Sequence, residues 1–538
     1  MTTGKRQGIS IRIPDVDSDD HVTIANRING HFVSIASDIP PLDRTKLPSY
    51  LPARPCPLLE PWEVFKELKA VNPSKACGPD GISGRLIKEF ALELCVPLTK
   101  IINSSYQSGR VPLQWKRATV VPVPKSKPAT LEAIRPISLT DQFAKVAESF
   151  IAKWTMQDMN SYLDQQQFGN RKGLSTVHCL VDILHHLCLN SDKPKTTSTL
   201  ILTDFSKAFD RIDQNIAVKK LLSLNVNPSL VLWISDFLMG RRQCVRYNTA
   251  ISEWTEISAG VPQGTKLGPI VFLAIINDAS LDIVDPVRRY KYVDDLTLLE
   301  CRDQRKDSNI QAAVTSLRDW SLRNQMRLNP QKCISMEVCF MRDAPPPSTV
   351  VLGDGVIAQQ QSVKLLGVFI QQNLKWDQHV NEMLRKANGK LHMLRLLKHH
   401  NVPTSDLLTV FNSYIRPTVE YAVPVWNPGL TKEHARKLEN IQKRALKIIL
   451  GREFSHYDDA LALLNICTLV DRRKQICLQF AKELNKPTGP CHHLMPQAPE
   501  TAFQMRLRKR MKVPQMKFRT NRLRDSPIPY SVNMLNEL

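Results

Sequence analysis

The stretch RRYKYVDDLTLLE, residues 288–300, places two adjacent aspartates between aromatic and apolar residues. Tyr, Val, Thr and Leu favour strands, so this stretch predicts two short strands joined by a tight turn. Adjacent carboxylates repel each other, and burying them unpaired is costly. Two explanations are open from this stretch alone. The turn is solvated, since Asp is a common turn residue, or a divalent cation offsets the negative charges.

A third acidic residue helps to choose between these explanations. Asp204 comes directly after the β-branched run ILT, where a strand is expected to end, and a helix is expected from about Ser206. Asp204 alone is explained equally well as a helix N-cap. Together with Asp294 and Asp295, however, it gives three carboxylates at two strand ends. That set suits two Mg²⁺ ions about 4 Å apart, an arrangement used in phosphoryl transfer.

Between these acids lies a glycine-rich loop with the sequence AGVPQGTKLGPIVFLAIIND, residues 259–278. Its glycines and the Gly268-Pro269 pair predict a tightly shaped loop that leads into an apolar helix. Such a loop lets a base pair approach the backbone, and Gln263 is suited to hydrogen-bonding a nucleotide. Without the neighbouring acids, the same loop is explained as an ordinary turn before a helix.

The composition points to a polyanionic partner. The chain has 538 residues, a net charge of +22 and 42% hydrophobic residues, which predicts roughly three to four packed domains. The charge favours nucleic acid first and an acidic membrane surface second. Residues 505–524 carry nine Lys and Arg and no acid. We therefore predict a nucleic-acid contact there, with a plain solvated tail as the alternative.

Other features bear on localisation and on metals. No apolar run approaches the roughly 20 residues of a membrane span, and the N-terminus lacks the apolar core of a signal peptide. We expect an intracellular protein that is not secreted, and the basic segment is compatible with a nuclear localisation signal. The 12 cysteines form no CxxC pair, so free thiols are expected. CHH, 491–493, has no second pair of zinc ligands at finger spacing.

The patterning predicts an alternation of helices and strands. A helix is expected to end near Gly109, a strand covers 117–125, and a long helix follows Thr140. Residues 229–248 are expected to form a helix followed by a strand. The chain is expected to be helical from about 305 to Arg327, and a strand is expected over 364–370. Long basic amphipathic helices dominate beyond about 375. We expect five segments: a loosely ordered, Pro-rich 1–57, a helical 58–105, a central 106–370, a helical 371–452 and a basic 453–538.

Three motifs in order carry a family resemblance. TDFSKAFD, GVPQGTKLGP and YVDD resemble motifs A, B and C of reverse transcriptases. Flanking blocks, among them KACGPDGIS, RPISLTDQFAKVAE, LNPQKC and RPTVEYAVPVWNPGL, narrow the resemblance to the non-LTR (LINE-type) retrotransposon group. The resemblance covers about residues 60–530. It implies an α+β right-hand polymerase with fingers, palm and thumb, here with a helical, basic C-terminal extension.

The resemblance also implies roles for individual residues. Asp204, Asp294, Asp295 and the carbonyl of Phe205 would hold two Mg²⁺ ions, for which Mn²⁺ is a substitute. One ion lowers the pKa of the primer 3′-hydroxyl and the other holds the triphosphate. Phe209 would be a steric gate against ribose, and Lys125 and Arg135 would grip the triphosphate. Gln263 and Gly264 would form the nucleotide-facing loop. Lys332 would donate a proton to pyrophosphate. A core position for Phe209, and ordinary surface charge for Lys125 and Arg135, are the alternatives.

The implied activity is RNA-directed DNA synthesis with an RNA template, a DNA primer and dNTPs. The sequence departs from the family pattern at Asn170, Leu174 and Thr265-Lys266. These departures do not affect the three aspartates of the proposed metal site. Full elements of this group carry an endonuclease, for which residues 1–57 are too short, so a separate endonuclease is an expected partner. The alternative is a catalytically inactive nucleic-acid-binding protein derived from such an element. An intron maturase or a telomere-adding enzyme ranks last.

Overall fold

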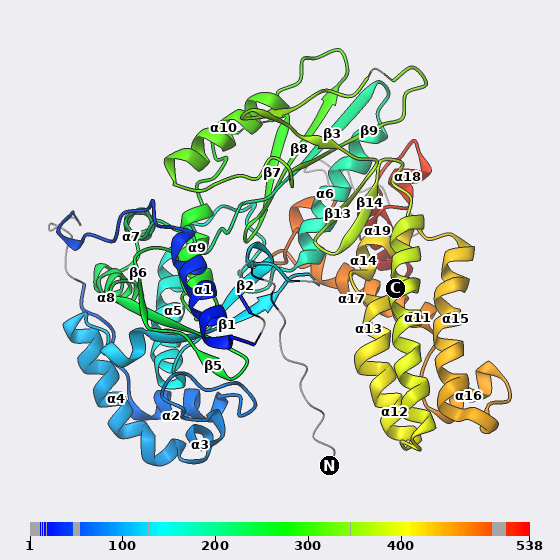
Figure 1. Cartoon of the computed structure of the whole chain (residues 1–538). Coiled ribbons are helices and arrows are strands. Elements are labelled where there is room, and N and C mark those ends of the chain that lie inside the picture. Colours follow the sequence, from blue (N-terminus) through cyan, green and yellow to red (C-terminus); the bar gives the residue numbers. More distant parts are fainter. Residues whose placement is uncertain are drawn as a thin grey trace. The chain divides into compact units, whose positions relative to one another are not determined.

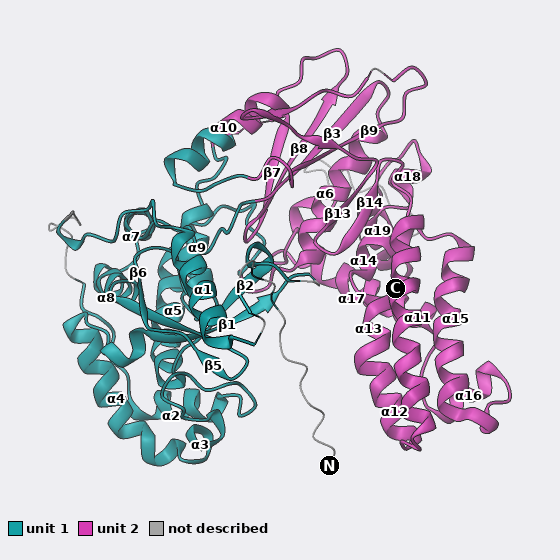
Figure 2. Ribbon diagram, in the orientation of Figure 1, with its two compact units in different colours: residues 1–170, 205–281, 317–328 teal, residues 171–204, 282–316, 329–538 magenta. Residues whose placement is uncertain are grey.

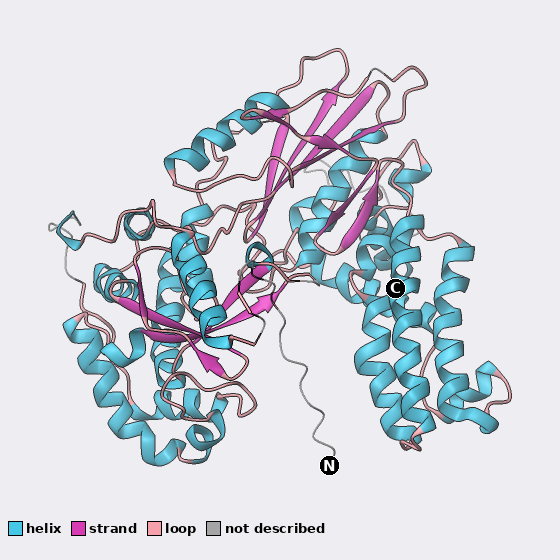
Figure 3. Cartoon of the chain, viewed as in Figure 1, coloured by secondary structure: helices cyan, strands magenta, loops and turns pink. Residues whose placement is uncertain are grey.

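Two compact units make up the chain. The computed structural model describes residues 11, 13, 16, 17, 19–46, 54–126, 129–283, 285–344, 346–497 and 513–538 (Figure 1). The first unit comprises residues 1–170, 205–281 and 317–328, and the second comprises 171–204, 282–316 and 329–538 (Figure 2). Each unit combines helices with a sheet (Figure 3). The predicted α+β class is therefore confirmed.

The first unit is built on a small mixed sheet. Strand β1 (Arg117–Pro124) pairs antiparallel with β2 (Ile134–Leu139) and parallel with β4 (Arg241–Tyr247). Two short strands, β5 (Ala250–Ile251) and β6 (Thr255–Ile257), each pair antiparallel with β4. Besides α1, which is described below, this unit contains the helices α2 (Pro61–Ala70), α3 (Gly84–Glu89), α4 (Ala91–Ser108), α5 (Gln142–Met159), α7 (Gln214–Ser223), α8 (Pro228–Leu238) and α9 (Gly268–Ile276).

Several predicted elements of this unit are confirmed. Helix α4 ends at Gly109, whose left-handed conformation (φ 61°) is the usual way to stop a helix. The strand predicted over 117–125 and the helix predicted after Thr140 are both present. Helix α9 is apolar around its whole circumference and almost completely buried, as expected for a helix inside a core.

The N-terminal segment is more ordered than predicted. Residues His21–Ser34 form helix α1, whose Ile24, Ile28 and Phe32 pack in one core cluster with Val120 of β1 and residues of β4. These apolar positions recur every four residues, which is a helical period. The prolines after residue 40 obscured this pattern in the sequence. Residues 47–53 of the Pro-rich stretch lie outside the described residues.

The second unit contains the sheet that carries the three acids. Its strand order is β12-β9-β3-β8-β7, with β3 (Thr196–Thr203) in the centre. Strand β3 pairs antiparallel with β8 (Asp295–Asp303) and β9 (Ile334–Cys339), β7 (Val287–Tyr292) pairs antiparallel with β8, and β12 (Ala358–Gln359) pairs parallel with β9. Helix α6 (Thr176–Ser191) packs along this sheet (Figure 1). The hairpin predicted for residues 288–300 is confirmed.

Three local predictions were wrong. The helix expected from about Ser206 begins only at Gln214, because Asp213 caps that helix by accepting hydrogen bonds from the backbone of residues 215 and 216. The single strand expected over 364–370 is a hairpin of β13 (Ser362–Leu365) and β14 (Val368–Gln371), which turns at Gly367 (φ 88°). The helix expected from 305 is shorter, as α10 (Ile310–Arg323).

Helices dominate the rest of the second unit, as predicted (Figure 3). The longest are α11 (Asp377–His399) and α15 (Lys432–Leu450), which pack against each other, and α17 (Leu469–Leu484) packs with α19 (Pro527–Glu537). The shorter elements are β10 (Val351–Leu352), β11 (Gly355–Val356), α12 (Thr404–Val410), α13 (Arg416–Glu420), α14 (Val423–Trp426), α16 (Tyr457–Leu463) and α18 (Asn521–Arg524). No helix in the described part of the chain is long and apolar enough to cross a bilayer.

The burial of α1 gives a first prediction. Ile28 is fully buried, whereas Val22 on the same helix is 55% exposed. We expect Ile28→Ala to lower the free energy of unfolding of the first unit by about 2–5 kcal/mol, because it leaves a cavity. Val22→Ala should change it by less than about 0.5 kcal/mol. Urea denaturation of both variants measures this difference. Equal effects would show that α1 does not belong to the core.

Candidate active site

The turn of the β7–β8 hairpin carries two of the candidate residues. Tyr292 pairs with Asp295, so Val293 and Asp294 are the two turn residues. Val293 has φ 60°, which is unusual for a β-branched residue, and the first turn position of such a hairpin is normally glycine. A strained backbone of this kind costs about 1–3 kcal/mol and is concentrated at functional sites. The turn that contains Asp294 and leads into Asp295 therefore has the kind of strained backbone that is concentrated at functional sites.

Strand pairing brings the third acid to the same end of the sheet. Thr203, the last residue of β3, pairs with Leu296, so Asp204 and Asp295 occupy the next position along the paired strands. Burial, and then the negative charges of Asp294 and Asp204, raise the pKa of Asp295 to about 6. The three predicted carboxylates are thus brought together within one unit and repel one another.

Lys332 lies beside this cluster, as the resemblance implied. Its Nζ is 3.6 Å from Oδ2 of Asp204, and the backbone N–H of Asn329 donates to the carbonyl of Asp204 at 2.9 Å. Oδ2 of Asp204 is buried and accepts no hydrogen bond from any residue that the structure describes. Since the Lys332 side chain is 62% exposed, its ammonium offsets only part of the negative charge.

The donor set matches the preference of a hard divalent cation. Ionised carboxylates offer only acceptor oxygens, and a cation among them removes their mutual repulsion. The side chains as they stand do not form a ligand cluster, because among the described residues no three His, Cys, Asp or Glu side chains are close enough to hold a metal ion. The charge and the donor chemistry of these three carboxylates therefore fit a divalent cation.

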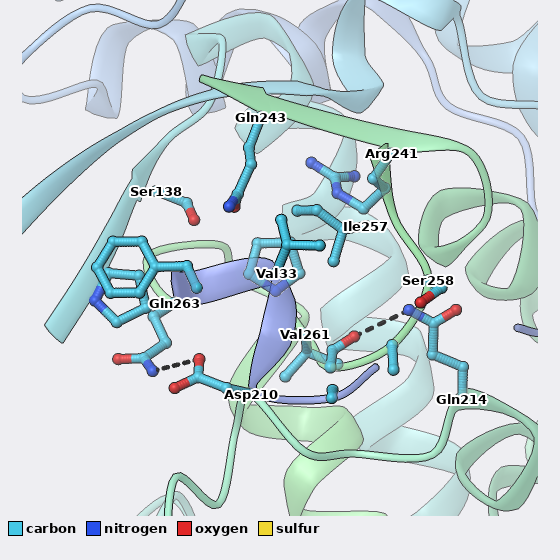
Figure 4. A pocket seen from close by; sticks show the side chains of 16 residues that line it. Val33, Ser138, Asp210, Gln214, Arg241, Gln243, Ile257, Ser258, Val261 and Gln263 are labelled. Atoms are coloured by element: carbon cyan, nitrogen blue, oxygen red, sulfur yellow. Dashed lines mark hydrogen bonds between the residues drawn. The ribbon is translucent and has the colours of Figure 1, made fainter. Parts of the chain in front are cut away.

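The glycine-rich loop forms a second group of candidate residues, in the first unit. Figure 4 shows Gln263 pointing toward Asp210, and its Nε2 donates to Oδ1 of Asp210 at 2.8 Å. The backbone N–H of Ser138 donates to the carbonyl of Gln263 at 2.7 Å. Gly264 has φ 117°, and a Cβ there would lie 2.8 Å from the carbonyl oxygen of Ser138. This position therefore requires glycine.

Two acids that the sequence analysis missed hold this loop, namely Glu148, which is fully buried, and Asp210, which is partly buried. Oε2 of Glu148 accepts the backbone N–H groups of Lys266 and Leu267 at 2.8 and 3.3 Å. Burial raises the pKa of Glu148, although Arg241 and these hydrogen bonds oppose the rise. Burial also raises the pKa of Asp210. The partners of both acids are distant in the chain, so the local sequence pattern did not reveal them.

A small cavity lies behind the same loop. Its volume is about 50 Å³, and Figure 4 shows Asp210, Arg241, Gln243 and Gln263 among the side chains around it. Gln214 closes one side by donating from Nε2 to the carbonyl of Gly260 at 3.0 Å. A cavity of this size, with several polar groups on its walls, has room for ordered water.

The remaining predicted residues lie elsewhere in the first unit. The ring of Phe209 stacks on Phe272, with centroids 4.7 Å apart, so the alternative of a core role has a structural basis. Lys125 follows β1, and its backbone N–H donates to the carbonyl of Ala133 at 2.7 Å. Arg135 is exposed on β2, opposite Val123. Phe205 is buried and forms an isolated backbone bridge with residue 328.

Comparison with known proteins gives one family and several relatives. Residues 123–370 match the family described as reverse transcriptase (RNA-dependent DNA polymerase). The chain is 27% identical over 413 residues, or 73% of its length and 44% of the relative's, to a probable RNA-directed DNA polymerase from transposon X-element of Drosophila melanogaster. It is 24% identical to the RNA-directed DNA polymerase from mobile element jockey of Drosophila funebris, over 90% of this chain and 53% of that protein. The chain thus spans about half the length of these relatives.

Among solved structures, telomerase from Candida albicans in complex with a fragment of telomeric RNA matches with a TM-score of 0.34 and 13% identity. That match covers 74% of this chain and 67% of the telomerase chain.

The loop geometry gives a second prediction. Gly264→Ala should lower the free energy of unfolding by about 1–3 kcal/mol, because the new Cβ meets the Ser138 carbonyl at a strained φ. The control is Gly389→Ala in α11, where a Cβ meets nothing within 4 Å. That change should leave stability unchanged or raise it by up to about 1 kcal/mol. Thermal unfolding of both variants gives the comparison, and a tolerated Gly264→Ala would contradict the loop geometry.

The acid cluster gives a third prediction, for protein in EDTA. A carboxyl whose pKa rises from 3.8 to about 6 on folding disfavours the folded state once it ionises. Its destabilising effect is absent below pH 4, grows between pH 4 and 6, and is complete above pH 6. Asp295→Asn removes this effect, so its melting temperature should exceed that of the wild type at pH 8 and converge with it near pH 4. A wild type that is the more stable protein at pH 8 would refute the repulsion.

Proposed function

Residues 123–370 are a reverse transcriptase domain of the non-LTR retrotransposon type, and on this premise we propose that the chain is an RNA-directed DNA polymerase. It adds dNTPs to the 3′-hydroxyl of a DNA primer on an RNA template. The observation that carries the proposal is the electrostatic coupling of Asp204, Asp294 and Asp295 at one end of the β3–β8 pair.

Polymerases of this family use divalent metal ions, and we propose two Mg²⁺ ions for this chain, with Mn²⁺ as a substitute. Asp204, Asp294 and Asp295 would hold them, together with the carbonyl of Phe205. When bound, the ions supply Lewis-acid activation of the primer hydroxyl and stabilise the charge of the leaving pyrophosphate. The raised pKa of Asp295 supports this assignment, because a cation favours its ionised form.

Other side chains of the chain bind and orient the substrate. The Lys332 ammonium, near Asp204, donates a proton to the departing pyrophosphate. Asp210 fixes the amide of Gln263, which lies with Gly264 on the nucleotide-facing loop. Lys125 and Arg135, on the β1–β2 hairpin, hold the triphosphate. The position of Lys332 beside Asp204 and the hydrogen bond of Gln263 support their roles, whereas the roles of Lys125 and Arg135 rest on the family resemblance.

The central test of the function is primer extension by the purified protein. The assay uses a poly(rA) template, an oligo(dT) primer, dTTP and Mg²⁺. Asp294→Ala should reduce extension to background, because it removes a ligand oxygen pair from the acid cluster. Its affinity for the template–primer should change by less than about threefold, since basic residues elsewhere bind the phosphates.

Asp307→Ala is the matched control for this test. Asp307 is an exposed aspartate shortly after the far end of β8, and its removal should leave extension unchanged. If the wild type binds template–primer but does not extend it, the chain is an inactive nucleic-acid-binding protein. If Asp294→Ala loses binding and extension together, the metal assignment is wrong.

The proposed gate has a test of its own. Phe209→Val replaces the ring that would exclude a ribose 2′-hydroxyl with a smaller side chain. The preference for dTTP over UTP should therefore fall by about tenfold or more. Single-nucleotide extension with each substrate measures this preference. A lower melting temperature with an unchanged preference would instead assign Phe209 to the core, through its stacking on Phe272.

A further inference from the structure

A basic pocket lies in the second unit, at the end of β3 remote from the acids. We call it the α6–β3 pocket. Its volume is about 270 Å³. Three segments line it, namely the loop from α6 into β3 (residues 191–196), Phe340 and Met341 after β9, and Arg519, Thr520 and Arg522 at α18. Thr196, which lines this pocket, begins β3 and stands eight positions before Asp204, which at about 3.3 Å per residue separates them by roughly 26 Å.

The pocket is strongly cationic. Its described lining contains four cationic side chains and a single carboxylate, and these are Lys193, Lys195, Arg519, Arg522 and Asp192. The carboxylate of Asp192 accepts the backbone N–H groups of Arg519 (2.9 Å) and Thr520 (2.7 Å) and the hydroxyl of Thr520 (2.8 Å). Asp192 holds the backbone of residues 519–520, and its single negative charge offsets only one of the four cations in the described lining. An external anion is therefore attracted to the pocket.

The guanidinium of Arg522 is held in place by neighbouring groups and has an unpaired donor for such an anion. Its guanidinium lies 3.7 Å from the centroid of the Phe340 ring, and one of its NH₂ groups donates to the carbonyl of Ser191 at 3.3 Å. Its buried Nε, in contrast, has no hydrogen-bond acceptor anywhere in the described residues. A buried donor without a partner is costly, and a phosphate oxygen would satisfy it.

Aromatic surface accompanies these cations. Phe340 in the pocket is 38% exposed, and Phe518, between the exposed Lys517 and Arg519, is 44% exposed. Proteins that bind single-stranded nucleic acid combine a cationic groove for phosphates with aromatic rings on which bases stack. An acidic peptide would use the cations but would leave the rings in water. An acidic membrane needs a flat basic surface, whereas this one is a pocket.

We propose that the α6–β3 pocket binds single-stranded RNA, with its phosphates on Lys193, Arg519 and Arg522 and bases stacked on Phe340 and Phe518. This site is separate from the polymerase site at the other end of β3. Its occupancy does not depend on Asp204, Asp294 or Asp295. It would hold an unpaired part of the RNA while another part is copied.

The test blocks the polymerase site first. Protein saturated with a blunt RNA–DNA hybrid is titrated with short fluorescent oligo(rU), and anisotropy reports binding of this second strand. Wild type and Asp294→Ala should both bind it. Lys193→Gln/Arg519→Gln should weaken binding at least tenfold and reduce the slope of log K against log salt by about 1.4, or 0.7 for each phosphate contact. Phe340→Ala should also weaken binding, and Phe340→Trp should retain it.

Matched variants make the result decisive. Arg452→Gln/Lys486→Gln removes two exposed cations of the same unit outside the pocket and should alter binding less than twofold. The Lys193→Gln/Arg519→Gln variant should extend an annealed primer at the wild-type rate. The proposal is overturned if the blocked protein binds no second strand, if the two charge variants are equally weakened, or if anionic phosphatidylserine vesicles bind the pocket and displace oligo(rU). None of these outcomes depends on whether the chain is an active polymerase.

Discussion

The register of one antiparallel strand pair determines the chemistry of this protein. Strands β3 and β8 are paired so that Thr203 lies opposite Leu296, which leaves Asp204 next to Asp295 at the end of the ladder. A shift of one residue would turn every side chain of a strand to the opposite face and separate these acids. The buried apolar residues of β3 and β8 fix the register, because they fill the core beneath α6. Hydrophobic packing thus imposes the repulsion within the acid cluster.

Buried charge also shapes the glycine-rich loop of the first unit, although by a different route. Glu148 is fully buried on α5, and two backbone N–H groups of the loop compensate its carboxylate. Asp210 in turn holds the amide of Gln263. Removing either partner from such an arrangement is more damaging than replacing both, because an unsatisfied buried group remains. The loop therefore depends on acids that are distant from it in sequence.

The sequence allowed the acid cluster to be predicted because its signals are local. Alternating apolar residues around YVDD and a β-branched run before Asp204 identify two strands directly. The helix predicted from Ser206 failed for a local reason as well, since the better N-cap, Asp213, lies seven residues later. The partners of Glu148 and Asp210 were missed because each lies far away in the chain. Gln263 was predicted to face the nucleotide, and its hydrogen bond to Asp210 had no signature in the sequence.

The interleaving of the two units has a consequence for biosynthesis. The first unit is complete only when residues 317–328 have been synthesised. Residues 171–204, which are made earlier, belong to the second unit. At typical translation rates of about 5–20 residues per second, the early part of the first unit waits roughly ten to thirty seconds for its last segment. During that interval the apolar strand β3 has neither of its neighbours, β8 and β9. The nascent chain therefore exposes an unpaired apolar strand during this interval, and such edges are prone to aggregation.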